Sequence, residues 1–517
     1  MSPIDLAIFI SRVESICAEM GAILQRAAFS PNIKDRLDFS CALFDASGEL
    51  FAQAAHIPVH LGSMAYAMTS IVEGVDWQEG DMLVVNDPFL GGTHLPDVTV
   101  IAPVFARKLS GTADETELIC FVANRAHHAN IGATTPGSMP LSNSMDQEGL
   151  VIPPSIFVRK GKVDEKILAQ FTGLPGANTT GDFAAQMSAN RIGIERLRAL
   201  VSSVGLDQFM LGIGLINDYG EKLARSVLRK IPDGRYHFSD LMDDDGFGHL
   251  DVVLDVNLAV SGESIILDFS GSSKQVEGNI NCPVSVVAAA VFYAFRCLLP
   301  EQTPNCAGTF RCISIGVPAG SVLNAERPAA TAAGNVETSM RIVDVVLGAL
   351  SKAVPNEVPA ASQGTMNNVA MGARDGDDSW DYYETIAGGM GASESENGHS
   401  GVQCHMTNTL NTPIESLESH FPIRIMEYAL RENSGGQGVR VGGDGLIREF
   451  LFLEPTELTL LTERRRHSPW GLFGGEPGAR GKNSLDGRLL PGKCHERVNA
   501  GQVLRIETPG GGGYGQA

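Results

Sequence analysis

Residues 86–100 read NDPFLGGTHLPDVTV, and the apolar runs on both sides of this stretch are typical of β-strands. Pro96 disfavours a helical backbone at the preceding residue, so the middle of the stretch is predicted to be a bent loop between two strands. His94 and Asp97 lie three positions apart in this loop, behind two glycines. Such a turn can direct both side chains toward one point. Two interpretations follow: the pair satisfies loop hydrogen bonds, or it binds a metal ion.

The first 150 residues are predicted to alternate between helix and sheet around this loop. An apolar stripe with spacings of three and four runs from Leu6 to Ala27 and predicts a helix. Residues 39–53, FSCALFDASGELFAQ, predict a hairpin that turns at Ala46-Ser47-Gly48. Residues 118–132, LICFVANRAHHANIG, predict a further strand.

The rest of the chain divides into a central region and a C-terminal region. The central region is predicted to contain helices within residues 184–230, a strong hairpin at 249–273, and helical runs at 284–299 and 339–354. Residues 362–413 are dense in Gly, Asn, Ser and Thr, and the last 90 residues are typical of strands joined by glycine turns. We therefore expect a mixed α/β protein of several layers, with regions 1–180 (N-terminal, metal site), 181–360 (central helices and hairpin) and 361–517 (glycine-rich loops and strands).

The composition indicates a globular enzyme with a sizeable core. Of 517 residues, 43% are hydrophobic and 19% are charged, which excludes extensive disorder. The 58 glycines are a surplus that suits a protein rich in tight turns. The net charge of -21 argues against nucleic acid as a partner, and the one basic cluster, Arg464–Arg466, is too short to reverse that.

Cysteine usage and hydropathy predict a cytoplasmic protein. The nine cysteines form no CxxC pair, which indicates a reducing compartment and mostly buried thiols. The N-terminal residues lack the basic start and cleavage site of a signal peptide. No apolar run reaches the ~18 residues that a membrane helix needs, so we expect no membrane span.

Five histidines gather between residues 56 and 128, and with nearby carboxylates they suit a catalytic divalent ion such as zinc, manganese or iron. His127 and His128 would point to opposite faces of a strand, so at most one of them is expected to be a ligand. His56 and His60 are better interpreted as core histidines bonded to backbone.

Several acidic residues and glycine loops carry weaker signals. Asp38 either points into a pocket or pairs with Arg36 or Lys34, and Asp35 lies close by in the same segment. Glu148 and Glu384 stand beside glycine loops and could act as bases, although a structural role is the simpler interpretation for each. The segments GGEPGARGKN, GGMGASESENG and TPGGGGYG lack the spacing or context of a nucleotide site and are interpreted as turns.

Ten segments, spread from near residue 30 to the C-terminus, together resemble the hydantoinase B/oxoprolinase family. They are RLDFSCALFD, AHIPVHLGSM, NDPFLGGTHLPDVTV, NRAHHANIG, TPGSMP, YYETIAGGMG, NTLNTPIESLE, SGGQGVRVGGDG, RRRHSPWGLFGG and TPGGGGYG. The family comprises B-type subunits of ATP-dependent hydantoinases and lactam hydrolases, ketone carboxylases, and the C-terminal half of 5-oxoprolinase.

This resemblance implies a particular set of site residues. The metal ligands would be Asp38, His94, Asp97 and His127, with Asp35 as the alternative to Asp38. Three further residues would be candidates for proton transfer: His128, His60 and Glu148. The family's HHAD appears here as HHAN, with Asn130 in place of the acid, which removes any carboxylate role at that position.

The resemblance also implies partners and a reaction. An A-type partner subunit with an actin-like ATP site would phosphorylate a small cyclic amide, and this chain would complete ring opening at its metal in a hetero-oligomer. ATP would then be bound by the partner and not by this chain, in agreement with the missing nucleotide motif. Two alternatives stay open: a subunit of an ATP-dependent ketone carboxylase, and a non-catalytic scaffold for the A-type ATPase.

Overall fold

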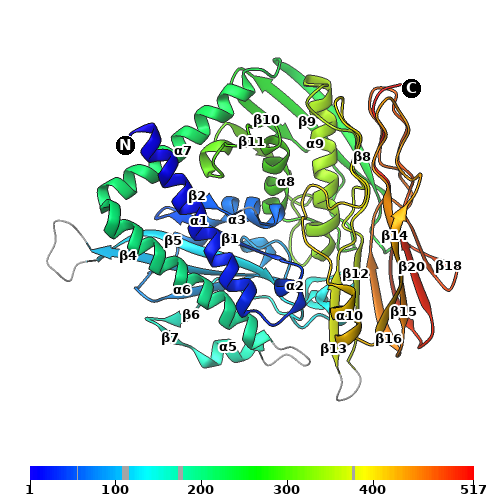
Figure 1. The fold of residues 1–517 in the computed structure, drawn as a ribbon, viewed down its shortest axis with the longest axis horizontal. Coiled ribbons are helices and arrows are strands. Elements are labelled where there is room, and N and C mark those ends of the chain that lie inside the picture. The colour runs from blue at the N-terminus through cyan, green and yellow to red at the C-terminus, as the bar shows by residue number, and fades with distance from the viewer. Residues whose placement is uncertain (55, 108–115, 173–178, 375–378, 517) are drawn as a thin grey trace.

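The computed structural model describes all of residues 1–517 except 55, 108–115, 173–178, 375–378 and 517. Four β-sheets and the helices that cover them form a layered arrangement, with the N-terminal sheet at one end and the C-terminal strands at the other (Figure 1). The mixed α/β class predicted from the sequence is therefore confirmed.

A seven-stranded antiparallel sheet, in the order β2-β1-β5-β4-β3-β6-β7, forms the centre of the N-terminal part. Its strands are β1 (Phe39–Asp45), β2 (Leu50–Gln53), β3 (Met82–Val85), β4 (Asp97–Arg107), β5 (Thr116–His127), β6 (Ser155–Arg159) and β7 (Lys162–Val163). The hairpin predicted at residues 39–53 is β1–β2. The strands predicted on both sides of the loop that contains His94 are β3 and β4.

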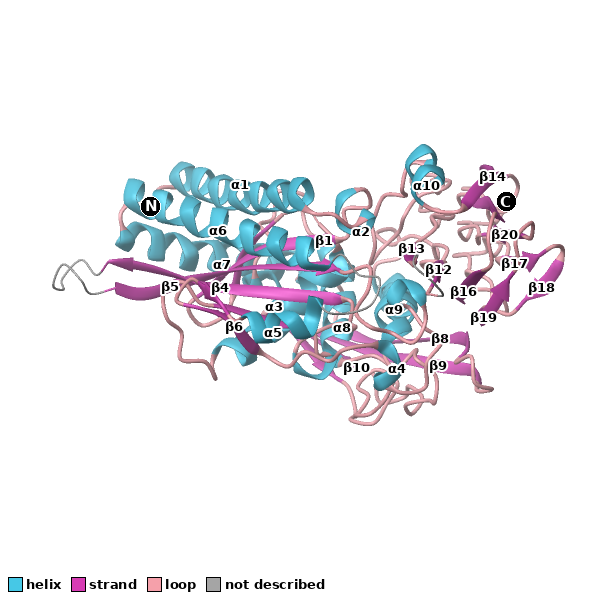
Figure 2. Cartoon of the chain, turned by 90° about the horizontal axis from the view of Figure 1, so that it is seen from below, coloured by secondary structure: helices cyan, strands magenta, loops and turns pink. Residues whose placement is uncertain are grey.

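Helices cover both faces of this sheet (Figure 2). On one face lie α1 (Pro3–Ala27), α6 (Thr179–Val204) and α7 (Leu206–Leu228), and on the other lies α3 (Pro58–Val72). α1 begins with a capping box, in which Ser2 and Asp5 each accept a hydrogen bond from the other's backbone. Successive strand residues point to opposite faces, so Leu43 packs beneath α1 while Phe44 packs beneath α3.

The central part is a four-stranded sheet in the order β11-β10-β9-β8, covered by two helices. These elements are β8 (Gly234–Asp244), β9 (Leu250–Ser261), β10 (Ser264–Asp268), β11 (Ile313–Gly316), α8 (Val284–Arg296) and α9 (Ser339–Ala353). The predicted strong hairpin is β9–β10. Both helices share one core with this sheet and also contact Ile57 and Val59, at the beginning of α3, so the central and N-terminal parts pack against each other.

The C-terminal part consists of two sheets that share a core. The first, in the order β13-β12-β16-β19, contains β12 (Asn368–Ala373), β13 (Trp380–Glu384), β16 (Thr456–Leu461) and β19 (Lys493–Val498). The second, in the order β14-β15-β20-β17-β18, contains β14 (Ile423–Arg431), β15 (Gly445–Phe452), β20 (Val503–Glu507), β17 (Lys482–Leu485) and β18 (Arg488–Leu490). The prediction of strands joined by glycine turns is confirmed here.

Short helical segments connect these parts. They are α2 (Pro31–Lys34), η1 (Pro88–Leu90), η2 (Pro136–Ser138), α4 (Met145–Glu148), α5 (Glu165–Thr172), η3 (Ala307–Phe310), the π-helical turn η4 (Gly334–Thr338) and α10 (Ile414–His420). The division into three regions remains a prediction, and α6 and α7, which it assigns to the central region, pack on the N-terminal sheet. Over the part of the chain that the structure describes, no single helix is long and apolar enough to cross a membrane, although the bent pair α6 and α7 has that length and composition jointly.

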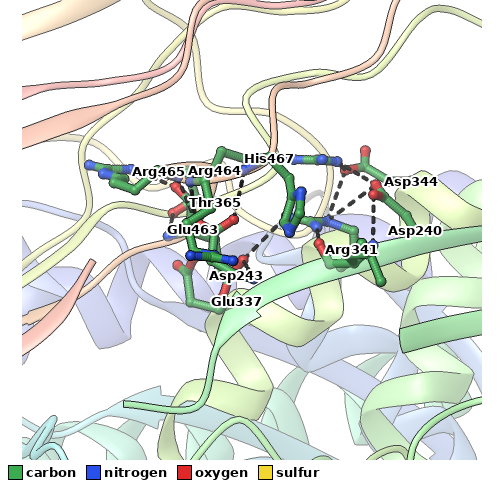
Figure 3. A network of polar contacts seen from close by, with 12 residues as sticks. Asp240, Asp243, Glu337, Arg341, Asp344, Thr365, Glu463, Arg464, Arg465 and His467 are labelled. Carbon is green, nitrogen blue, oxygen red and sulfur yellow. Dashed lines mark hydrogen bonds and ion pairs between the residues drawn. The ribbon is translucent and has the colours of Figure 1, made fainter. Parts of the chain in front are cut away.

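A buried network of charges joins the central part to the C-terminal part (Figure 3). Arg464, in the loop after β16, donates to Asp344 on α9 at 2.5 Å and to Asp240 on β8 at 2.7 Å. Burial alone would lower the pKa of Arg464, but these two carboxylates raise it. Beside these three residues, the Glu463 carboxylate accepts a hydrogen bond from Lys493 at 2.5 Å. Because these groups have little access to water, each depends on its partners.

We expect Arg464→Met to lower the free energy of unfolding by about 3–5 kcal/mol, because Asp240 and Asp344 would lose their principal cation while remaining buried. Denaturant titration measures this change. The matched control is Arg488→Met, which breaks the exposed pair with Glu496 and should cost no more than about 1 kcal/mol. Equal effects of the two substitutions would contradict the importance of the network.

Glu337, on η4, gives the same region a pH dependence. Burial, with a further contribution from the charge of Glu463, raises the pKa of Glu337 from 4.5 to about 8. The folded protein therefore keeps this group neutral where the unfolded chain ionises it. Its contribution to stability is fully present below pH 4.5 and is lost as the pH rises to about 8.

We therefore expect the free energy of unfolding of the wild type to fall between about pH 5 and pH 8, with a contribution from Glu337 of up to about 1.4 kcal/mol per pH unit. Glu337→Gln, which stays neutral, should remove that part of the slope in denaturant titrations across this pH range. Glu454→Gln, at an exposed position, is the control and should keep the wild-type slope.

Candidate metal centre

Glycines and one asparagine shape the loop between β3 and β4. Gly91 has φ of +102°, and a Cβ at Gly92 would lie 2.3 Å from the carbonyl oxygen of Asn86. The Asn86 side chain donates to the Leu95 carbonyl at 2.7 Å and accepts from the Ile152 amide at 2.6 Å. The loop is thus held in one conformation, which brings its last residues to the start of β4.

The register of the sheet brings the three principal candidates together. Asp97 is the first residue of β4 and pairs with His127, the last residue of β5. His94 lies three residues before Asp97 in the same loop. All three side chains are buried, and one candidate ligand atom from each lies within 4.8 Å of the others. The prediction that His94 and Asp97 point toward one place is therefore confirmed.

The two oxygens of the Asp97 carboxylate have different surroundings. Oδ2 accepts from Thr93 Oγ1 at 2.5 Å and from Asn335 Nδ2 at 3.2 Å, and it lies 3.1 Å from His60 Nε2. Oδ1 faces the candidate imidazoles instead, 3.1 Å from His94 Nε2 and 3.3 Å from His127 Nδ1. Oδ2 is therefore surrounded by hydrogen-bonding groups of the protein, whereas Oδ1 faces the candidate metal site.

Three buried atoms of this cluster make no hydrogen bond of acceptable geometry to a described residue, although the first two lie 3.1 Å apart: His94 Nε2, Asp97 Oδ1 and His127 Nε2. The ring of His94 is fixed by its other nitrogen, because Nδ1 lies 3.1 Å from the Ala332 carbonyl, which can only accept. Nδ1 therefore carries the proton in that bond, and a neutral His94 presents a lone pair at Nε2. Buried polar atoms without partners are costly, so this donor set fits a divalent cation.

The charge states of Asp97 and His127 agree with a ligand role, whereas the pKa of His94, which burial alone would lower, is raised by Asp97. Burial alone would raise the pKa of Asp97, but His60 and His94 hold it well below its usual value, so the carboxylate is ionised. Burial lowers the pKa of His127 and favours its neutral form. An ionised carboxylate and a neutral imidazole are the forms that bind metal ions.

Asp38 lines the same cavity as the three candidate ligands. Its carboxylate lies 3.8 Å from His60 Nε2 and 3.6 Å from Arg36 Nη2, and its backbone oxygen accepts from the His127 amide at 3.0 Å. Both predicted environments, the pocket and the pair with Arg36, are thus present. Asp35 is not among the residues that line the cavity. Asp38 lies outside the tight group of three, so its role as a fourth ligand remains a prediction.

The two histidines of AHIPVHLGSM have different roles. His56 accepts from the Cys41 amide at 3.1 Å, and burial lowers its pKa to about 4, as expected for a core histidine. His60 instead lines the cavity, with Nε2 between the carboxylates of Asp97 and Asp38. The interpretation of His60 as a core histidine is therefore wrong, because the first turn of α3 directs it to the site.

His128 and Glu148 do not join the cavity. His128 follows the last residue of β5 and packs against α6, where Nε2 lies 2.9 Å from Gln186 Oε1 and the ring contacts Phe183. Because adjacent strand positions point to opposite faces, His127 and His128 are separated, as predicted. The carboxylate of Glu148 accepts from the amides of residues 331 and 332 at 2.9 Å. Neither residue lies where a proton could pass directly to a ligand in the cavity.

Glu148 nevertheless supports the site from a distance. It fixes the segment around Ala332, whose carbonyl oxygen in turn holds His94. Two further polar residues named from the sequence are structural: Glu384 pairs with Arg448 at 3.1 Å, and Asn130 donates to Asp381 at 2.9 Å. Glu148 is therefore a positioning residue for His94.

The structure adds two site residues that the sequence analysis does not single out. Asn335 reaches Asp97 from η4, and π-helical turns of this kind are frequent at functional sites. Tyr383, on β13, stacks on His127 with ring centroids 4.8 Å apart and an angle of 16°. The cavity enclosed by these residues has a volume of about 20 Å³, enough for about one water molecule.

Comparisons with known proteins cover the whole chain. The family model described as hydantoinase B/oxoprolinase matches residues 2–517. The chain is 42% identical to 5-oxoprolinase 1 of Arabidopsis thaliana. The match covers 99% of this chain and 42% of the plant protein. It is 30% identical to the B-type subunit of a putative D-/L-hydantoinase from a Pseudomonas species, covering 90% of it. The chain therefore spans about two fifths of the plant 5-oxoprolinase and nearly all of the bacterial protein.

Solved structures show the same fold. The ATP-dependent caprolactamase from Pseudomonas jessenii superposes over the whole chain and 91% of its own, with a TM-score of 0.91 and 27% identity. Acetone carboxylase superposes over 99% of the chain and 76% of its own, with a TM-score of 0.88, and at 18% identity the likeness concerns the fold alone. By the whole-chain match and these relatives, the chain belongs to the hydantoinase B/oxoprolinase family.

Proposed function

We propose that this chain is the metal-dependent B-type subunit of an ATP-dependent cyclic amide hydrolase, which opens a hydantoin, 5-oxoproline or lactam ring. The observation that carries the proposal is the buried group of His94, Asp97 and His127, whose unpartnered atoms fit a divalent cation. The names of the relatives, 5-oxoprolinase, hydantoinase and caprolactamase, support the substrate class.

The proposal assigns ATP to an A-type partner subunit, which phosphorylates the amide oxygen before this chain acts. Phosphorylation makes the amide carbon more electrophilic and the nitrogen a better leaving group. Two observations support the assignment: one relative is named as the B-type component of a hydantoinase, and the plant 5-oxoprolinase is more than twice the length that this chain matches. The sequence, in addition, contains no nucleotide-binding fingerprint.

A bound zinc, manganese or iron ion would supply Lewis-acid chemistry, polarising an oxygen of the substrate and acidifying water. His94, Asp97 and His127 would hold it, with Asp38 as a fourth candidate ligand. His60 also lies beside these ligands, and its Nε2 is placed between the carboxylates of Asp97 and Asp38. Ring opening requires a proton on the departing nitrogen, and His60 is placed to deliver it.

We expect the purified wild-type chain to retain about one divalent ion and His94→Ala to weaken metal retention by more than about tenfold, because one of three converging ligands is lost. Elemental analysis after dialysis against a weak chelator measures both. The control is His420→Ala, which removes an exposed histidine on α10 and should retain the ion. A wild type without a stoichiometric ion would refute the metal-dependent function and favour the scaffold.

We expect His60→Gln to keep the ion but to lower kcat by about 10²–10⁴ when the chain is assayed with its A-type partner and ATP. The assay uses 5-oxoproline, hydantoin and caprolactam, and it measures ring-opened product. Turnover should not depend on bicarbonate. A strict requirement for bicarbonate would favour the carboxylase alternative, and an unchanged kcat in His60→Gln would remove this residue from the mechanism.

A further inference from the structure

Three buried threonines line the cavity of the candidate metal centre and have no part in holding the ion. Thr385 follows β13 in the segment YYETIAGGMG, while Thr407 and Thr409 lie on either side of Asn408, where NTLNTPIESLE begins. Their relative exposures are 2%, 3% and 5%. Both segments carry the family resemblance, and neither contributes a candidate ligand. Their hydroxyl groups are therefore available for another role in the cavity.

The hydrogen bonds of Thr385 determine the direction of its proton. Its Oγ1 lies 3.2 Å from Gln403 Nε2 and 3.5 Å from Arg36 Nη2, and both of these nitrogens can only donate. A hydroxyl oxygen has two lone pairs, so Thr385 uses both as an acceptor. Its own proton is then directed to the remaining neighbour, Thr409 Oγ1, at 2.8 Å.

The same reasoning continues to Thr407. Thr409 accepts the proton of Thr385, and its own hydroxyl lies 3.3 Å from Thr407 Oγ1. Thr407 Oγ1 also accepts from the backbone amide of Thr409 at 3.4 Å. When Thr409 is the donor between the two hydroxyls, both lone pairs of Thr407 are used. The proton of Thr407 then has no acceptor among the described contacts, and in the opposite direction the proton of Thr409 is the one left; both hydroxyls line the cavity.

Arg36 strengthens this chain of donors. Its side chain is fully buried and lies over the ring of Tyr383, 4.7 Å from the centroid. A buried cation at the first donor polarises each hydroxyl that follows, because hydrogen bonds in series reinforce one another at low local dielectric. The same Arg36 nitrogen lies 3.6 Å from the Asp38 carboxylate, so its charge acts on both Asp38 and the hydroxyl chain.

We propose that the Thr385–Thr409–Thr407 hydroxyl chain is a substrate-binding element, in which Thr407 donates to an anionic oxygen of the amide substrate beside the metal ligands. This inference rests on the proposed function. The shared chemistry is an acceptor oxygen with negative charge, either on the phosphoryl group or on the carbonyl carbon as it becomes tetrahedral. The cavity of about 20 Å³ has room for about one oxygen-sized group, so only the acceptor oxygen itself would enter between the two sets of residues.

The test measures equilibrium binding of two small probes, inorganic phosphate and acetate, to the full chain carrying the ion that it retains on purification. Isothermal titration calorimetry compares the wild type with Thr407→Val and Thr407→Ser. We expect Thr407→Val to bind on the order of tenfold more weakly, because a hydrogen bond to a charged group is lost. Thr407→Ser keeps the hydroxyl and should stay within about twofold of the wild type.

The two probes separate the two sources of the anionic oxygen. Tighter binding of phosphate identifies the phosphoryl oxygen, and tighter binding of acetate identifies the carbonyl oxygen. Thr409→Val, which interrupts the chain without removing Thr407, should also weaken the probe. Thr412→Val is the matched control, because it removes a buried hydroxyl in the same segment that does not line the cavity.

Equal affinities of Thr407→Val and wild type, or no binding of either probe to wild type that holds its ion, would overturn the inference. Metal content is measured on every sample, so a failure of this inference is distinguishable from a failure of the proposed function. A failure of this inference alone would leave a stoichiometric ion in all the threonine variants. A failure of the proposed function would show as a wild type that lacks a stoichiometric ion.

Discussion

The structure around the cavity depends on one buried charge, the carboxylate of Asp97. A carboxylate without access to water is tolerated only where hydrogen bonds and opposite charges surround it. Here the partners come from separate elements: Thr93 from its own loop, His60 from α3, Asn335 from η4 and His127 from β5. Each of these elements must take its place before Asp97 can be buried. The site therefore forms only when the N-terminal and central parts pack against each other.

The C-terminal part enters the same arrangement through aromatic and polar contacts. Tyr383 stacks on His127, and its hydroxyl donates to Asn368, whose side-chain nitrogen donates in turn to Glu337 on η4. The buried pairs of Arg464 then fix α9, the helix that continues from η4, to the loop after β16. These contacts hold the wall of the cavity that the C-terminal segments supply. A site described by residues 1–180 alone would lack this wall.

The convergence of His94 and Asp97 was predictable from local geometry, whereas the full set of candidate ligands was implied by the family resemblance. Pro96 and the glycines before His94 indicate a bent loop at the end of one strand. The period of two in a strand separates His127 from His128, and the antiparallel pairing of β4 with β5 then places Asp97 opposite His127. The choice of Asp38, and of His127 rather than His128, came from the family resemblance and not from spacing. The mixed α/β class followed from hydrophobic periodicity, since both the sheets and their covering helices carry clear patterns.

The groups that position these ligands could not be predicted, and the reason is physical. Glu148 acts on His94 through the backbone at residues 331 and 332, more than 180 positions away in the sequence. Asn335 reaches Asp97 because one turn of its helix is π-helical, which no residue pattern in that segment indicates. A ligand is recognisable by its own chemistry at a short spacing, whereas a positioning group is an ordinary polar residue until a distant segment packs against it. The hydroxyl chain from Thr385 to Thr407 belongs to this second kind, since only the fold brings these three hydroxyls together at the cavity.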